Sequence, residues 1–112
     1  MLEAVWSVEF GSTIGSVGAG IVVFETGRVF GGDSAFMYIG KFRVENGIVH
    51  AEINVSKYSN LSQMQSIFGD LTNFNLAITG TANRDVMLLT GVVVGSPSMQ
   101  IALKAIRRAE LP

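Results

Sequence analysis

Apolar and polar side chains alternate along most of this chain, and this alternation limits its fold more than any other feature. In residues 4–10 (AVWSVEF), Trp6, Val8 and Phe10 fall on one face of an extended strand, while Ser7 and Glu9 fall on the other. A period of two is typical of strands that bury one face, whereas a helix repeats every 3.6 residues. The sequence therefore predicts a protein built mainly of strands.

Short turn sequences join the predicted strands to their neighbours. Asn46-Gly47 separates two alternating runs within residues 38–57 and is typical of a hairpin turn in which both central residues have positive φ. After Leu103 the alternation slips at Ile106-Arg107-Arg108, which predicts a bulge near the end of the last strand. Three more segments have turn compositions: Glu25-Thr26-Gly27-Arg28, Asn83-Arg84-Asp85 and Ser96-Pro97-Ser98.

One stretch departs from the alternation. In residues 59–70 (SNLSQMQSIFGD), Leu61, Met64 and Phe68 recur at helical spacing, and Gly69 can end a helix in a left-handed conformation. The stretch predicts one short helix between the fifth and sixth strands.

Eight predicted strands with short connections form an antiparallel meander, and residues 1–112 are expected to make a single domain. Closure of the sheet removes the exposed edges, so we predict an all-β, eight-stranded antiparallel up-and-down barrel with one short helix. Glycines within the strand-like stretches favour the sharp bends that a barrel needs. A flat two-sheet sandwich is the alternative.

Composition limits the partners. Hydrophobic residues make up 48% of the chain and charged residues 15%, so self-association is expected. The formal charge is −1 and the only basic cluster is Lys104, Arg107 and Arg108, which argues against nucleic-acid binding. The chain has no cysteine, no basic segment followed by an apolar one at its N-terminus, and no apolar run of about 18 residues. A cytoplasmic protein without a membrane partner is predicted.

The residues that could carry chemistry do not converge. His50 is the only histidine, and the alternation gives it only Glu52 as a same-face carboxylate. No serine lies in a Gly-x-Ser-x-Gly elbow, and the carboxylates are scattered. We therefore expect no catalytic residue, metal site or cofactor, and a protein that is not an enzyme.

Gly31-Gly32-Asp33 is the most conspicuous motif in the chain. It cannot be a phosphate-binding P-loop, because no Lys-Ser/Thr pair follows it and no helix starts there. The interruption of an apolar run favours a glycine corner between two strands, with Asp33 accepting backbone N–H groups in an Asx turn.

A set of inward aromatic and methionine side chains has two interpretations. The set can be the packed core of the barrel, or it can line a cavity for an apolar ligand. Its members are Trp6, Phe10, Phe42, Phe74, Met87 and Met99.

The order of motifs resembles the GrlR-type negative regulators of bacterial type III secretion. WSVEF is followed by a glycine-rich GAGIVVFETGRVFGGDSAFMYIGKF, then by LTNFNLAITG and a terminal MQIALKAIRRAEL. The residues that match the family pattern are Gly18, Gly20, Ile21, Gly27, Gly31, Gly32, Asp33, Tyr38 and Gly40.

The resemblance implies a lipocalin-like barrel that forms a homodimer and sequesters a transcriptional activator without catalysis. It places the activator-binding loop at Glu45, Asn46 and Gly47. The family's regulator carries a run of four alternating acidic residues there, whereas this chain has only Glu45. A barrel that holds an apolar small molecule in its lumen is the alternative function.

Overall fold

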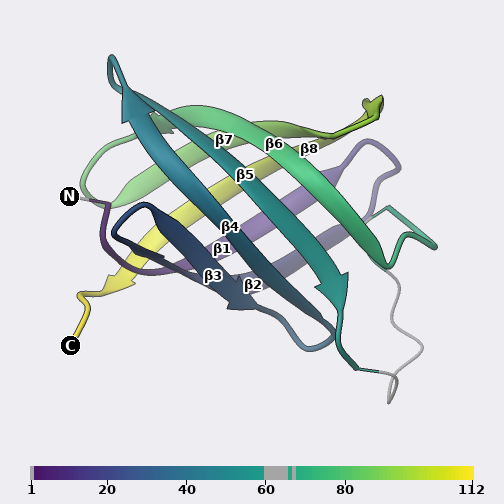
Figure 1. Ribbon diagram of the computed structural model, residues 1–112, viewed down its shortest axis with the longest axis horizontal. Coiled ribbons are helices and arrows are strands. Elements are labelled where there is room, and N and C mark those ends of the chain that lie inside the picture. The colour runs from purple at the N-terminus through teal and green to yellow at the C-terminus, as the bar shows by residue number, and fades with distance from the viewer. Residues whose placement is uncertain (1, 60–65, 67) are drawn as a thin grey trace.

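The computed structural model describes residues 2–59, 66 and 68–112, and these form eight strands (Figure 1). Each strand pairs antiparallel with the next, and β1 also pairs with β8, so the sheet closes into a barrel. The predicted eight-stranded up-and-down barrel is confirmed, and the flat sandwich is wrong. The strands are β1 (Ala4–Ser12), β2 (Val17–Glu25), β3 (Arg28–Gly32), β4 (Phe36–Glu45), β5 (Ile48–Lys57), β6 (Asn73–Ala82), β7 (Val86–Val93) and β8 (Ser96–Ala109).

The alternation of the sequence sets which side chains point into the barrel. In β5 the apolar residues from Val49 to Val55 are buried at every second position, while Glu52 between them is exposed. In β1, Trp6 and Val8 are buried in the same way. All eight strands contribute to one continuous core inside the barrel.

The barrel has two distinct ends because its strands alternate in direction. One end, called the terminal end below, carries both chain termini and the β2–β3, β4–β5 and β6–β7 turns (Figure 1). The other, called the loop end, carries the β1–β2, β3–β4, β5–β6 and β7–β8 connections. Residues far apart in the chain therefore meet at each end.

Two of the predicted turns have the expected backbone. Asn46 and Gly47 have φ of 52° and 78°, and Thr26 and Gly27 have φ of 51° and 78°. Positive φ at both central residues matches the right-handed twist of the flanking strands. The turn after β6 is also confirmed, because the Asn83 side chain accepts hydrogen bonds from the backbone N–H groups of Asp85 and Val86.

The predicted turn at Ser96-Pro97-Ser98 is wrong, because these residues belong to β8. The chain reverses at Val94-Gly95 instead, where Gly95 has φ of 89°. The ladder between β7 and β8 is irregular between Val92 and Val93, so Pro97 lies where the regular pairing is interrupted. Proline is tolerated in a strand at such an irregularity because no ladder N–H is needed there.

The predicted bulge near the end of the last strand is confirmed. Trp6 pairs with Arg107, whereas Val5 pairs with Ala109, so Arg108 is an extra residue in the ladder. The extra residue accounts for the slip of the alternation that the sequence shows at this point.

The predicted helix falls mainly on residues 60–65 and 67, which lie outside the described residues. In the described part of that stretch, Ser66 and residues 68–70 are not helical. The Ser66 hydroxyl accepts the backbone N–H of Phe68 at 3.1 Å, a local bond that competes with helical bonding. Nowhere in residues 2–59, 66 and 68–112 is there a helix long and apolar enough to cross a membrane.

Candidate ligand site in the lumen

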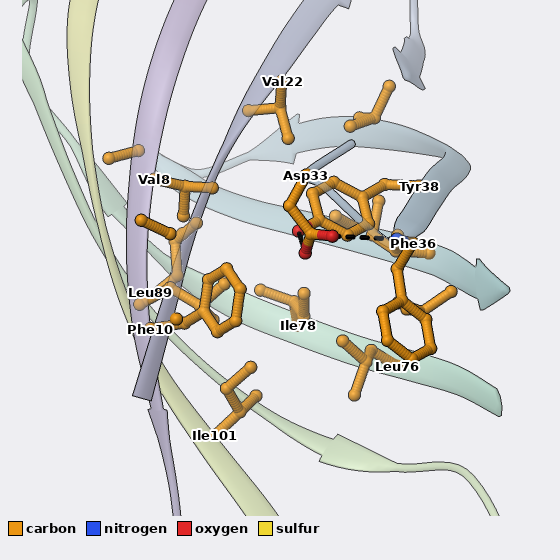
Figure 2. Close-up of a pocket in the computed structure, with 18 of the residues that line it drawn as sticks. Val8, Phe10, Val22, Asp33, Phe36, Tyr38, Leu76, Ile78, Leu89 and Ile101 are labelled. Carbon is orange, nitrogen blue, oxygen red and sulfur yellow. Dashed lines mark hydrogen bonds between the residues drawn. The ribbon is translucent and has the colours of Figure 1, made fainter. Parts of the chain in front are cut away.

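The barrel lumen contains a cavity of about 180 Å³ (Figure 2). All eight strands contribute to its wall, and most of the wall is apolar, as at Val8, Ile53 and Leu76. The exposed residues Val17 and Ser34 also line it, so the cavity reaches the surface at the loop end. A concave and mainly apolar space is the usual form of a small-molecule site.

Two inward-facing glycines of β2 shape one side of the cavity. A Cβ atom on Gly18 would lie 2.5 Å from the Phe10 ring, and one on Gly20 would lie 2.8 Å from the Tyr38 hydroxyl oxygen. The two aromatic side chains therefore occupy the space that β2 leaves empty. The rings of Phe10 on β1 and Tyr38 on β4 therefore form this part of the wall. Each ring lies over a glycine and shields its backbone from solvent.

Asp33 lies in the β3–β4 loop and lines the cavity. Its Oδ1 atom accepts the backbone N–H groups of Ala35 at 2.9 Å and Phe36 at 2.8 Å. Its Oδ2 atom accepts the hydroxyl proton of Tyr38. The expected Asx turn is confirmed, and in Figure 2 the carboxylate lies beside Tyr38 and Phe36, on the cavity side of the loop.

The Tyr38 hydroxyl is a permanent donor to Asp33. Burial raises the pKa of Tyr38 far above its usual value, because the phenolate would lose its water. The hydrogen bond to Asp33 and the negative charge of that carboxylate raise the pKa further. The hydroxyl therefore stays protonated, and its oxygen can still accept a hydrogen bond from another group.

Residues of the β5–β6 connection partly cover the loop end. The Tyr58 hydroxyl donates to the Asp33 carbonyl at 2.6 Å, and Ser66 lines the cavity. Phe68 is buried and packs edge-on against Phe74 with ring centroids 5.5 Å apart. Asp33 is thus held from its backbone as well as through its carboxylate.

An aromatic cluster closes the terminal end. The fully buried Trp6 packs beside Phe24, with centroids 6.3 Å apart, and Phe24 contacts Phe42 at 4.8 Å. The indole N–H donates to the Leu2 carbonyl at 2.9 Å, and the Arg107 guanidinium lies 5.0 Å from the indole ring centroid. The two ends of the barrel are therefore different: one is packed with rings and the other leads to the cavity.

The residues predicted to line the lumen divide into two groups. Phe10, Phe74 and Met87 line the cavity. Trp6 and Phe42 belong instead to the aromatic cluster, and Met99 is a half-buried residue that packs against the core, so these three do not line this cavity. Alternation predicts which side chains point inward but carries no information on their depth along the barrel axis.

Asp33 and Tyr38 line the cavity but are not among the residues predicted to do so. Tyr38 had a usable signal, because it lies two residues after Phe36 and two before Gly40 on the inward face of β4. Asp33 had none, because it lies between β3 and β4, where alternation stops.

The β4–β5 hairpin lies at the terminal end, away from the mouth of the cavity (Figure 1). Glu45 is exposed there and accepts a hydrogen bond from the Arg43 Nε–H, which is the main cause of a lowered Glu45 pKa. The role of Glu45, Asn46 and Gly47 in binding a partner stays a prediction.

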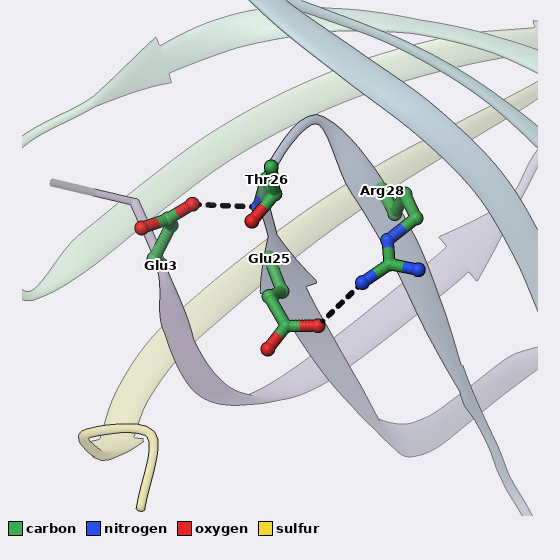
Figure 3. A network of polar contacts seen from close by, with 4 residues as sticks. All are labelled: Glu3, Glu25, Thr26 and Arg28. Carbon is green, nitrogen blue, oxygen red and sulfur yellow. Dashed lines mark hydrogen bonds and ion pairs between the residues drawn. The ribbon is translucent and has the colours of Figure 1, made fainter.

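The β2–β3 turn, also at the terminal end, carries local polar contacts. Thr26 N–H donates to the Glu3 carboxylate at 2.6 Å, and Arg28 pairs with Glu25 at 2.8 Å (Figure 3). These groups are exposed; the first contact joins the residue before β1 to the β2–β3 turn, and the second joins the ends of β2 and β3. Exposed pairs of this kind contribute little to stability.

Fold and site together define a closed β-barrel with an apolar lumen and one polar, hydrogen-bonded edge. No family model matches the chain, and a search of curated proteins finds no relative. The resemblance to GrlR-type regulators therefore rests on the sequence motifs alone.

Proposed function

We propose that this barrel binds a small apolar molecule in its lumen and acts by binding, without catalysis. The observation that carries the proposal is the cavity of about 180 Å³ behind a mouth at the loop end. Had side chains filled the lumen, no ligand could enter it. The absence of cysteine suits a reducing compartment, so a cytoplasmic location is part of the proposal.

The size of the cavity limits the ligand. An apolar cavity of about 150 Å³ in another protein holds benzene, and drug-sized ligands need about 300 Å³ or more. The lumen, at about 180 Å³, therefore suits a single ring with a short substituent or a short branched chain. Transfer of such a molecule from water to an apolar wall supplies the affinity.

Filling the lumen is expected to weaken ligand binding. Ala51 is buried and lines the cavity, so Ala51→Leu places three more carbon atoms in the wall. We expect the affinity for ethylbenzene, measured by calorimetric titration, to fall by at least about tenfold, because the probe and the new side chain compete for one space. Ala77→Leu is the matched control, since Ala77 is exposed on the outer face of β6, opposite Glu52 and next to the pairing partner of Ala51.

Two results would count against the lumen as the site. One is equal ethylbenzene affinity in Ala51→Leu and the unmodified chain. The other is an absence of ethylbenzene binding in the unmodified chain. Far-UV circular dichroism of each variant shows that the barrel has formed.

A second candidate function is protein interaction, and an exposed apolar patch favours it. Ile21, Val23 and Phe30 lie on the outer faces of β2 and β3, with Met37 and Ile39 beside them on β4. Phe30 pairs directly with both Val23 and Ile39, so the five residues are contiguous; we call them the β2–β4 patch. Its occupant is proposed to be a second copy of the chain, because two identical uncharged faces meet without repulsion in a two-fold contact.

A charge placed in the β2–β4 patch is expected to separate the dimer. Ile39 is 53% exposed, so Ile39→Glu puts a carboxylate on the surface without disturbing the core. Sedimentation velocity should show a dimer for the unmodified chain and a monomer for the variant. Leu88→Glu is the control, because Leu88 is 59% exposed but lies on β7. A monomeric unmodified chain at high micromolar concentration would rule out the dimer.

Sequestration of an activator is the role that the family resemblance implies. It would use Glu45, Asn46 and Gly47 at the terminal end. A single exposed acid paired with Arg43 gives little affinity for a basic surface, so the lumen and the patch are the stronger candidates.

A further inference from the structure

Asp33 is the only charged side chain among the described residues that line the lumen. The ion pairs of Arg28 with Glu25, Lys41 with Glu52 and Arg43 with Glu45 do not include Asp33, and Asp33 pairs with no cation within residues 2–59, 66 and 68–112. A carboxylate at the edge of an apolar cavity is therefore neutralised by no cation of the described chain. Charge in such a place is costly unless it is paired or hydrogen-bonded.

The hydrogen bonds that Asp33 already makes show what it can still accept. An ionised carboxylate offers about four acceptor positions. Oδ1 uses two of them for the backbone N–H groups of Ala35 and Phe36, and Oδ2 uses one for Tyr38. One position on Oδ2 remains, and the Tyr38 oxygen next to it can also accept. Both remaining positions call for a donor from the ligand.

We propose that the lumen selects a small apolar amine, with its hydrocarbon part in the cavity and its ammonium group at Asp33 Oδ2 and the Tyr38 oxygen. This rests on the proposed function, namely that the lumen binds a ligand at all. An ammonium group supplies several donors and the missing positive charge, whereas a hydroxyl supplies one donor and no charge. A carboxylate or ketone supplies no donor and would face the Asp33 charge.

Hydrogen bonds to the Asp33 backbone fix the position of its carboxylate. The Asp33 backbone N–H donates to the Phe36 carbonyl at 2.9 Å, and the Asp33 carbonyl accepts the Tyr58 hydroxyl at 2.6 Å. These two backbone hydrogen bonds and the three hydrogen bonds to the carboxylate hold both the main chain and the side chain of Asp33 in place. A preorganised acceptor loses little freedom when the ligand binds, which raises affinity.

Three probes of equal heavy-atom count test the proposal on the unmodified chain: ethylbenzene, benzyl alcohol and benzylamine, at pH 7. Calorimetric titration should give benzylamine an affinity at least about tenfold higher than that of ethylbenzene, with benzyl alcohol between them. Ethylbenzene binding with no gain for benzylamine would overturn the proposal and leave the lumen function standing. If none of the three binds, the lumen function itself fails. Equal affinity for the alcohol and the amine would show that charge is not recognised, which also overturns the proposal.

A matched pair of variants locates the selectivity. In Asp33→Asn the side-chain oxygen can still accept the two backbone N–H groups of the turn, but the charge is gone. We expect this variant to lose the preference, so that the ratio of benzylamine affinity to ethylbenzene affinity falls to about one. Asp85→Asn, in the β6–β7 turn at the terminal end, removes the same charge and should keep the preference. Equal loss of preference in both variants would show that the amine responds only to net charge.

Discussion

Gly40→Ala is expected to prevent the barrel from closing in its present form. A Cβ atom on Gly40 would lie 2.0 Å from the Glu52 carbonyl oxygen and 2.9 Å from the Ile53 Cα. Both contacts are with the backbone of β5, so no side-chain rotation can relieve them. We expect the free energy of unfolding, measured by urea denaturation at 25 °C, to fall by at least about 3 kcal/mol, at the upper limit of the usual overpacking cost.

Gly11→Ala is the control for this substitution. A Cβ atom there would lie 3.8 Å from its nearest neighbours, Ser16 O and Val17 Cγ1, which is ordinary contact. The change should alter the free energy of unfolding by less than about 1 kcal/mol. If both variants lose the same stability, the loss in Gly40→Ala does not come from a clash of its Cβ atom with the β5 backbone.

Trp6→Ala is the second substitution with a large expected effect. The indole is fully buried, packs beside Phe24 and donates to the Leu2 carbonyl. Its removal leaves a cavity at the terminal end and a carbonyl without its donor, so we expect a loss of about 3–5 kcal/mol in the free energy of unfolding.

Trp6→Phe separates the two contributions in the same urea experiment. It keeps an aromatic ring in the cluster and removes only the indole N–H and part of the volume, so it should lose clearly less than Trp6→Ala. A loss below about 1 kcal/mol for Trp6→Ala would contradict the view that the aromatic cluster closes and stabilises the terminal end.

The architecture of this protein was predictable from its sequence because one period runs through nearly every strand. The burial of Val49 and Val55, with Glu52 exposed between them, follows directly from that alternation. Closure was favoured over the flat sandwich because a closed meander with one apolar face buries that face and leaves no exposed edge. The bulge at Arg108 was visible as a break in the same period.

The errors share a physical cause, which is that local patterns do not report position in three dimensions. The turn assigned to Ser96-Pro97-Ser98 was placed by composition, but Gly95 next to it supplies the positive φ that the reversal needs. Trp6 and Met87 are both fully buried, yet only Met87 lines the cavity, because their heights along the barrel axis differ. The volume of the lumen depends on where each inward side chain lies along the barrel axis and on how the aromatic rings are oriented.

Gly31-Gly32-Asp33 illustrates the same limit in the candidate site. The sequence predicted its local role, and the Asx turn is present. Its position at the edge of the lumen depends on the pairing of β3 with β4, which brings Gly31 opposite Tyr38 and Asp33 within reach of the Tyr38 hydroxyl. Asp33, a turn residue, is thus part of the cavity wall because of the pairing between β3 and β4, which cannot be predicted from the sequence around Asp33 alone.

The most direct test of the lumen as a binding site is an NMR measurement of where ethylbenzene lies. Isotope-filtered NOE spectra of the labelled protein should show contacts from the probe to lumen-lining side chains such as Phe10, Ile78 and Ile101. Contacts confined to the outer β2–β4 patch, for example to Ile39, or an absence of any contact at saturating probe, would contradict the proposal that this barrel binds its ligand inside.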